Sequence, residues 1–358
     1  MNPRNIASAI VLSALSISIC ASRVNAQQQD WSKLTADARA AHQTGDYALA
    51  ATLYKSALAI QENTLGPTNP VVAASLNNLA VLYQDENQFT QAEPLYRQSL
   101  AIWEKTPGAD TVLANNLNNL ADVYRDEGKD DEAQPLYIRA LKIWEKTGQI
   151  ETPETAATLT SLGDIYHSHG KDSEAEPLYN RALAIWKKSG QLEGPEVTAA
   201  LTKLGDIYGS QNKYGDAELV YQNALAIWAN SGQQESPKAV TTMNSLAQIY
   251  RTHAKYAEAE QLLVRVLAIN EKKLGPEHID VAASAGSLAL LYNCEGKYAE
   301  AESLYKTAIQ IRETNLGPED PAVLHTLEIY AAMLRQEGRK DEARKIEART
   351  EKIETPRS

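Results

Sequence analysis

The sequence predicts an all-α protein of about eight stacked helix hairpins, and three observations carry this prediction. An alanine recurs in steps of 41 or 42 residues along nearly the whole chain, and a fixed period of about 20–50 residues is typical of stacked repeats. Each unit holds two stretches with apolar residues at helical spacing. No stretch alternates apolar and polar residues for long, so no strand is predicted. The recurring alanines are Ala50, Ala92, Ala133, Ala175, Ala217, Ala259, Ala301 and Ala343.

The second unit illustrates how each hairpin is predicted. "VVAASLNNLAVLYQD" places Leu76, Leu79 and Tyr83 on one helical face, because residues three and four apart share a face. "ENQ" interrupts this first helix, and "FTQAEPLYRQSLAIWEK" gives a second apolar helical face. "TPGAD" ends the unit with Pro and Gly, which terminate helices. The unit is therefore two helices joined by a short turn.

A column of small residues predicts close packing of the two helices. The column lies in the first helix of every unit, next to large Leu and Tyr positions, and close helix approach needs small side chains at the contact. Its members are Ala38, Ala80, Ala121, Gly163, Gly205, Ala247, Ala289 and Ala331. One hairpin cannot cover its own apolar face, so each needs neighbours.

Several residues of the second helices have a structural interpretation and an alternative. Tryptophans occupy one column of units two to five: Trp103, Trp144, Trp186 and Trp228. We expect them to pack on the next hairpin, and the alternative is an aromatic ladder that grips a partner. Prolines recur in "EPLY" and "QPLY": Pro94, Pro135 and Pro177. We expect them near the start of a helix, where a missing N–H costs least.

The N-terminal residues have the three-part pattern of a secretory signal peptide. Arg4 precedes an apolar stretch of 14 residues, and small residues follow. We expect cleavage after Ala26, which makes the protein periplasmic or secreted, without stable membrane insertion after cleavage. A transmembrane anchor would need about 20 apolar residues. A lipoprotein signal at Cys20 is the other alternative, although Ile19 stands where a small residue is usual. The predicted parts are residues 1–26, a repeat domain at 27–350 and a tail at 351–358.

Composition and motifs exclude several function classes. The formal net charge of −11 argues against nucleic-acid binding, which usually needs a basic face. No phosphate loop, nucleophile elbow or zinc-protease motif occurs, so we expect no enzyme activity and no cofactor. His167 and His169 do not share a helical face, so no metal site is predicted. After signal cleavage only Cys294 remains, which leaves pairing with another chain open.

The recurring phrases "LNNLAVLY", "GKYAEAESLY", "RALAIW" and "LGPEHIDVAASAGSLALLY" resemble the tetratricopeptide repeat. Their long period is similar to that of kinesin light chains and their bacterial relatives, over roughly residues 30–350. The resemblance implies a right-handed α-α superhelix, a tetratricopeptide solenoid whose first helices line a concave face. It also implies a module that binds a peptide or protein, without naming the partner.

If that geometry holds, three columns of the first helices form the groove. The residues proposed to bind a peptide are, in the first column, Asn77, Asn118 and Asn244; in the middle column, Asp122, Asp164, Asp206 and Gln248; and in the third column, Arg125, His167 and Arg251. Asparagine both donates and accepts hydrogen bonds, so it can hold an extended peptide by its backbone.

The middle column suggests a charge preference. Asp122, Asp164 and Asp206 stand one repeat apart, and like charges in a groove reinforce one another. We predict that the central groove prefers a basic ligand, whereas the grooves of kinesin light chains favour acidic peptides. The alternative is that these carboxylates only pair with Lys203 and Arg125 or keep the groove wet.

Two classes of function remain open at this stage. The first is a non-enzymatic scaffold of the cell envelope that recruits a protein or peptide through the groove. The second is a structural protein that assembles with itself, although the charged last helix and Asp37 in the first unit argue against end-to-end stacking. An exported factor that acts on host proteins is a further alternative.

Overall fold

A computed structural model describes residue 28 and residues 30–354, all in helices or in the short connections between them. No strand occurs in this part of the chain, so the predicted all-α class is confirmed. The predicted signal peptide lies outside the described residues.

Helical residues 30–43 come first. The helices that follow are α2 (Tyr47–Leu65), α3 (Pro70–Asp85), α4 (Phe89–Trp103), α5 (Asp110–Asp126), α6 (Asp130–Thr147), α7 (Pro153–Ser168), α8 (Asp172–Ser189), α9 (Pro195–Ser210), α10 (Tyr214–Asn230), α11 (Pro237–Thr252), α12 (Tyr256–Leu274), α13 (Ile279–Glu295), α14 (Tyr298–Leu316), α15 (Pro321–Gln336) and α16 (Lys340–Glu354).

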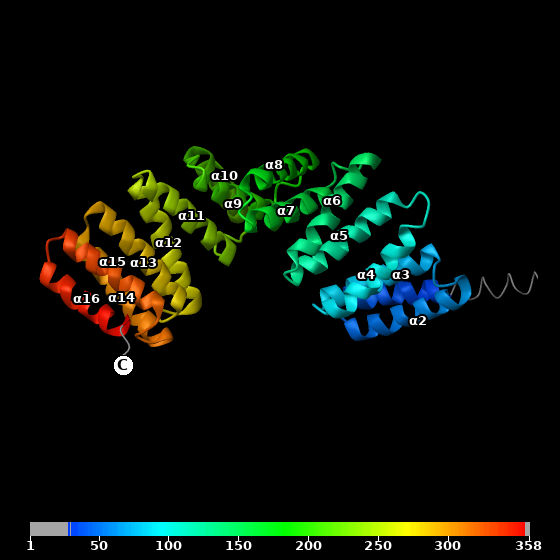
Figure 1. The fold of residues 1–358 in the computed structure, drawn as a ribbon, viewed down its shortest axis with the longest axis horizontal. Coiled ribbons are helices and arrows are strands. Elements are labelled where there is room, and N and C mark those ends of the chain that lie inside the picture. Colours follow the sequence, from blue (N-terminus) through cyan, green and yellow to red (C-terminus); the bar gives the residue numbers. More distant parts are fainter. Residues whose placement is uncertain (1–27, 29, 355–358) are drawn as a thin grey trace, which may run out of the picture. The chain divides into compact units, whose positions relative to one another are not determined.

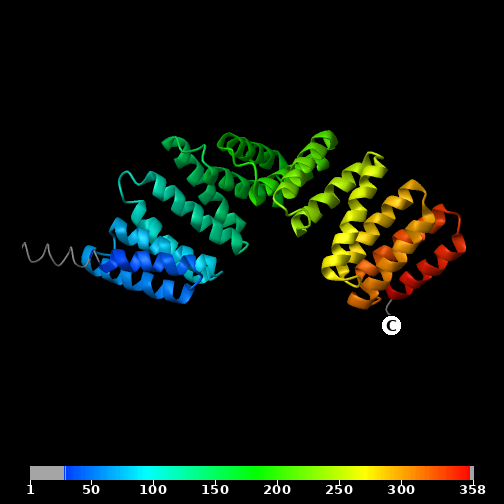
Figure 2. The same cartoon turned by 180° about the vertical axis from the view of Figure 1, so that it is seen from behind.

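Consecutive helices form the hairpins that the repeat predicts, and the chain divides into two compact units. Unit 1 extends to Ile185 and unit 2 begins at Trp186, so the boundary falls within α8. In unit 1, α3 packs on α4 and α5 on α6. In unit 2, α9 packs on α10, α11 on α12, α13 on α14 and α15 on α16 (Figures 1 and 2). Each hairpin also contacts the next one within its unit, for example α12 on α13.

Proline and a capping side chain fix where many first helices begin. Pro70 is the first residue of α3, and the side chain of Asn69 accepts a hydrogen bond from the Val71 N–H at 2.9 Å. Ser236 before Pro237 caps α11 in the same manner. Proline suits this position because its fixed φ is helical and its missing N–H would have no helical partner.

The turn inside each hairpin needs one residue with positive φ. Glycine supplies it in five hairpins, as at Gly128 (φ 74°), because glycine lacks the Cβ that penalises this conformation. Asn87 and Asn212 occupy the same turn position with φ of 57° and 58°. Ala254, between α11 and α12, takes φ 54° although alanine is disfavoured there.

The predicted core columns are buried. The small-residue column of the first helices and the recurring alanines of the second helices are at most 2% exposed wherever an exposure is given. The four tryptophans are 4–9% exposed, and Trp228 packs with Met243 and Ile269, which confirms their structural interpretation. The prolines of the second helices were expected near a helix start, where the missing N–H costs least, and this cost was underestimated. Pro94 is the sixth residue of α4, past the first turn, so it removes a helical hydrogen bond.

Candidate functional site

The middle column of unit 1 is joined to buried tyrosines. The hydroxyl of Tyr137 donates to Asp122 Oδ1 at 2.6 Å, and that of Tyr179 donates to Asp164 Oδ1 at 2.6 Å. Each tyrosine lies in the second helix, 15 residues after its aspartate, and is fully buried. In both repeats a carboxylate on the first-helix face therefore holds the second helix of its own hairpin.

Unit 2 begins with the same pair. Tyr221 donates to Asp206 Oδ1 at 2.6 Å and is 2% exposed. The sequence analysis placed the three aspartates in the groove but did not identify the tyrosines as their partners. The constant spacing of 15 residues was the signal that could have done so.

Close approach of the helices lets these rings reach their aspartates. A Cβ added to Gly205 would lie 2.5 Å from the Tyr221 ring, and one added to Gly163 would lie 3.0 Å from the Tyr179 ring. Both separations are shorter than a normal carbon contact of about 3.5–4.0 Å. The glycines in the small-residue column therefore make room for an aromatic ring.

The surroundings of Asp122 alter the pKa of its carboxyl. Burial raises the pKa of the Asp122 carboxyl, while the hydrogen bond from Tyr137 and the charge of Arg125 oppose that rise. Arg125 also donates to the Ser161 hydroxyl and, at 3.4 Å, to Asp126. The predicted alternative, in which Arg125 offsets the charge of this column, has support at Asp122.

The remaining predicted site residues of unit 1 also have partners within the protein. Asn118 donates to Asp122 at 3.0 Å and accepts from the Thr158 hydroxyl at 2.6 Å. Asn77 accepts from Asn116 at 3.1 Å. His167 shares a hydrogen bond of 2.7 Å with Asp172, a partner in the next helix of its hairpin. A ligand of this face would have to compete with these contacts.

The predicted site residues on α11 of unit 2, in contrast, have side chains without partners in the described chain. Asn244, Gln248 and Arg251 line one cavity of about 330 Å³. Within residues 30–354, no hydrogen bond or ion pair engages these three side chains, and the Oδ1 atom of Asn244 is buried without a partner. The cavity is completed by residues of α11, α12 and α13: Thr241, Ser245, Ala247, Leu263, Ser287 and Leu290.

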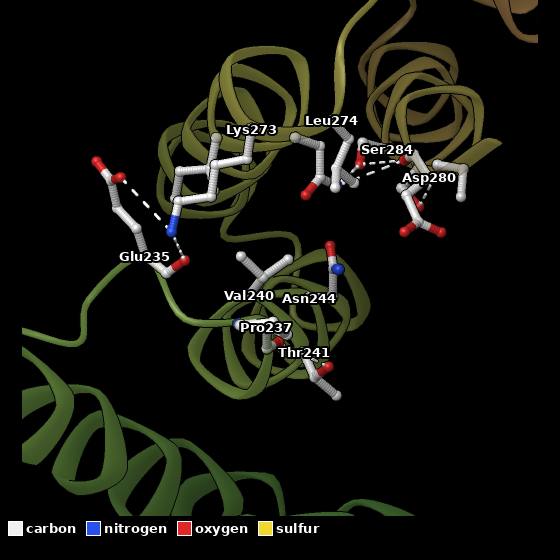
Figure 3. A pocket seen from close by; sticks show the side chains of 13 residues that line it. Glu235, Pro237, Val240, Thr241, Asn244, Lys273, Leu274, Asp280 and Ser284 are labelled. Carbon is white, nitrogen blue, oxygen red and sulfur yellow. Dashed lines mark hydrogen bonds and ion pairs between the residues drawn. The ribbon is translucent and has the colours of Figure 1, made fainter. Parts of the chain in front are cut away.

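A second cavity of about 330 Å³ continues the first along α11 and α13. The two share Thr241, Asn244 and Ser287 in their linings. Figure 3 shows the side chains of Val240 and Asn244 pointing from α11 into this second cavity. On its far side Lys273 lies 3.9 Å from the carboxylate of Glu235. The α11–α13 face of unit 2 is thus a continuous cleft whose lining mixes apolar side chains with hydroxyls and unengaged amides.

In the described part of the chain, metal binding, membrane spanning and a free thiol can each be checked against the structure. No group of three or more His, Cys, Asp or Glu side chains there could hold a metal ion. None of the helices from residue 30 to 354 is both long and apolar enough to span a membrane. The thiol of Cys294 is free and exposed, and its pairing with another chain stays a prediction.

Comparison of the sequence with family models gives a match to the tetratricopeptide repeat. The matched residues are 36–105, 112–188, 196–272, 255–314 and 280–353. They cover well over half of the chain, including every predicted site residue. The comparison with curated proteins gives no match.

Solved structures provide further similarities. A putative kinesin light chain from Podosopora anserina, with nearly identical repeats, is 28% identical; the match covers 58% of this chain and 98% of that one, with a TM-score of 0.50. A signal-transduction ATPase with a tetratricopeptide repeat sensor from Pyrococcus horikoshii is 17% identical, over 85% of this chain and 44% of that one, with a TM-score of 0.58. Aspartyl phosphate phosphatase F from Bacillus subtilis is 16% identical, over 86% and 76%, with a TM-score of 0.52. The last two similarities concern the fold alone.

Proposed function

The chain belongs to the tetratricopeptide repeat family, whose members typically serve as scaffolds for protein–protein interaction, and from this premise we propose that it binds an extended peptide segment of a partner protein. The binding site in this proposal is the α11–α13 cleft of unit 2. The role is non-enzymatic. It needs no cofactor, because recognition uses side-chain amides, hydroxyls and one guanidinium.

One observation carries the proposal: the same three columns are engaged in the third repeat and unengaged in the sixth. Asn118 and Asp122 hydrogen-bond to each other and to neighbouring side chains. Their counterparts Asn244 and Gln248 have no partner in the described chain, and Asn244 Oδ1 is buried. A buried acceptor without a donor costs about 1–3 kcal/mol. An extended peptide carries backbone N–H groups that could relieve this cost.

The charges of the face suggest two local preferences. Arg251 has no carboxylate partner among the described residues, so we propose that the cleft favours a ligand carboxylate beside it. Outside this cleft, the aspartates of the middle column favour a basic side chain beside them, as the sequence suggests. Because each aspartate already accepts a tyrosine hydroxyl, a ligand amine would use its remaining lone pairs.

Fluorescence anisotropy with synthetic peptides of varied sequence and net charge tests the proposal. We expect binding by a subset of peptides, weakened about tenfold or more when Asn244→Ala and Gln248→Ala are combined, since each bond to the peptide contributes about 1 kcal/mol. Gln261→Ala is the matched control, because Gln261 is exposed on α12 outside the cleft. Unchanged binding in the double variant would exclude this cleft as the site.

The charge preferences have a separate readout in the same assay. Arg251→Gln should weaken acidic peptides more than neutral ones, and the effect should shrink in high salt. Asp122→Asn, Asp164→Asn and Asp206→Asn together should weaken the binding of basic peptides beside these aspartates, which lie outside the α11–α13 cleft. If acidic and basic peptides bind the wild-type protein equally at low salt, the preference of the middle column does not exist.

The proposed location is the periplasm or the exterior of the cell. The support is the sequence of residues 1–26, with its arginine, apolar stretch and small residues. N-terminal sequencing of the protein purified from fractionated source cells tests it. A mature chain starting at Gln27 is expected, and an intact N-terminus in the cytoplasmic fraction would contradict the proposal.

A further inference from the structure

The sixth hairpin lacks the buried tyrosine, as does the last, which has Glu347 at the equivalent position. Six of the second helices carry a tyrosine there, at most 3% exposed: Tyr54, Tyr96, Tyr137, Tyr179, Tyr221 and Tyr305. In α12 the position is Leu263, which ends short of the space that a tyrosine ring and hydroxyl would occupy. Leu263 is 4% exposed and forms part of the wall of the cavity beside Gln248.

In four of the other hairpins, the hydroxyl of the buried tyrosine donates a hydrogen bond to the first helix. The Tyr96 hydroxyl donates to Gln84 Oε1 at 2.8 Å, and the other hydroxyls that find acceptors bond to the middle column. Gln248 stands 15 residues before Leu263, as Asp206 stands before Tyr221. With leucine in place of tyrosine, Gln248 loses its internal donor, and the space above Leu263 stays open to the cleft.

The seventh hairpin keeps the tyrosine but lacks an acceptor for it in the middle column. Tyr305 is present and 1% exposed, but the middle column offers Leu290 in place of an aspartate. The Tyr305 hydroxyl is buried without a partner. Leu290 instead contributes an apolar surface to the same cavity that Leu263 lines. The tyrosine position of the sixth hairpin and the middle column of the seventh thus each contribute a leucine to one cavity.

We propose that this cavity is an anchor pocket for one apolar side chain, of the size of leucine, methionine or phenylalanine, from the extended peptide that the cleft binds. The side chain would enter from the first-helix face and contact Leu263, Leu290 and Ala247. Asn244 and Gln248 at the rim would then engage the peptide backbone on either side of it. The inference rests on the proposed function and adds the class of ligand residue to it.

The lining divides into an apolar part, formed by Ala247, Leu263 and Leu290, and a polar part that includes Arg251. A charged ligand group placed against the apolar part would contact leucine side chains and lose its hydration without compensation. Burying an apolar side chain of that size stabilises a complex by roughly 1.5–3 kcal/mol. The cavity of about 330 Å³ has room for one such side chain.

Leu263→Tyr tests the inference, because it restores the residue that six other hairpins carry. The variant is expected to fold, since Ala247 leaves the same room that Ala121 leaves for the fully buried Tyr137. The probes are the N-acetyl amides of leucine, phenylalanine, lysine and aspartate, monitored through the NMR signals of the leucine methyl groups. We expect the leucine and phenylalanine probes to shift the Leu263 and Leu290 methyls more than the lysine and aspartate probes do, because only the apolar side chains pack against these leucines.

In Leu263→Tyr the shift of Leu290 by the apolar probes should disappear, and peptides selected for the wild-type cleft should bind at least tenfold more weakly. Leu219→Tyr is the matched control, because Leu219 is 57% exposed on α10, and it should leave both readouts unchanged. Leu290→Gln changes a half-buried side chain and makes the wall polar, so it should also weaken the apolar probes.

The outcomes separate this inference from the proposed function. If peptides bind Leu263→Tyr as tightly as the wild type, while the Asn244 and Gln248 double variant loses them, the cleft binds peptides and the anchor pocket is wrong. Equal shifts by all four probes would also overturn the pocket. If no peptide binds the wild-type protein, the proposed function fails first.

Discussion

At the scale of the residue, one tyrosine position shows how the same side chain acquires different roles. Tyr221 is satisfied by Asp206, whereas the Tyr305 hydroxyl is buried without a partner because Leu290 occupies the aspartate position. In the sixth hairpin the tyrosine itself is missing, because Leu263 occupies its position, and Gln248 in the middle column is left without a hydroxyl donor. The middle column and the tyrosine column therefore have to be considered as pairs, since the energetic effect of each residue depends on its partner.

Replacing the glycines of the first helices by alanine should destabilise the protein at some positions and stabilise it at another. Gly205→Ala should destabilise the protein by about 1–2 kcal/mol, because a Cβ at 2.5 Å from the Tyr221 ring costs more than the helix propensity gained. Gly163→Ala, at 3.0 Å from Tyr179, should cost less. Gly286→Ala meets nothing within 4 Å and should stabilise by about 1 kcal/mol. Urea unfolding of the three variants checks the order, and a loss of stability in Gly286→Ala would contradict it.

At the scale of the element, the hairpin is held by its turn and by contacts to the next hairpin. The positive-φ residue of the turn reverses the chain, and a glutamate of the second helix reaches the next hairpin. In unit 2 the Lys297 amine lies 3.1 Å from Glu260, and the Tyr292 hydroxyl donates to the same carboxylate at 2.9 Å. Such contacts recur, so each hairpin is stabilised mainly by its immediate neighbours.

The turn between α11 and α12 predicts a stabilising substitution. Ala254→Gly should raise the free energy of unfolding by about 1 kcal/mol, because alanine at φ 54° is strained and glycine is not. Asn212→Gly at the equivalent turn is the control and should have a smaller effect, since asparagine tolerates this conformation. Thermal unfolding measures both. A decrease in stability for Ala254→Gly would show that the alanine side chain has a packing role.

A glutamate between the last two hairpins predicts a pH dependence. Hydrogen bonds from Arg339, Lys306 and Tyr330 lower the pKa of Glu302 to about 2, from an ordinary value of 4.5. A lowered folded-state pKa stabilises the folded protein above pH 4.5, and this contribution is lost as the pH falls from 4.5 towards 2.

Glu302→Gln should therefore be less stable than the wild type at pH 7, and the difference should shrink below pH 4.5. Glu319→Gln, at an exposed position, serves as the control and should match the wild type throughout. The measurement is urea unfolding at a series of pH values. A difference for Glu302→Gln that is constant with pH would exclude the charge as the cause.

At the scale of the whole molecule, the chain consists of two compact units, and the boundary between them in the sequence falls within α8. In a repeat protein, stability is roughly the sum of hairpin terms and neighbour terms, so damage remains local. Leu117→Ala removes a fully buried side chain of α5 and should cost about 2–5 kcal/mol in unit 1. Hydrogen exchange should show lost protection in α5 and its neighbours, with α13 to α16 unchanged. Equal loss in both units would show that the chain unfolds as one.

The fold was predictable because its information is local and repeated. A helical face, a turn with glycine and a proline start each depend on a few adjacent residues, and eight copies made the period plain. The prolines inside the second helices were less predictable. Pro94 lies in the second turn of α4, because neighbouring hairpins stabilise a helix that its local sequence alone would weaken.

The sequence by itself determined the all-α class, the hairpin period, the buried columns and the list of residues on the first-helix face. The tertiary structure alone decided which of them have partners within the described chain. Asp122, Asp164 and Asp206 carry the more conspicuous pattern, yet their carboxylates accept tyrosine hydroxyls, while Asn244, Gln248 and Arg251 line an open cavity without partners in the described chain. The reason is physical: engagement depends on what the second helix places 15 residues later, and only packing brings those two positions together.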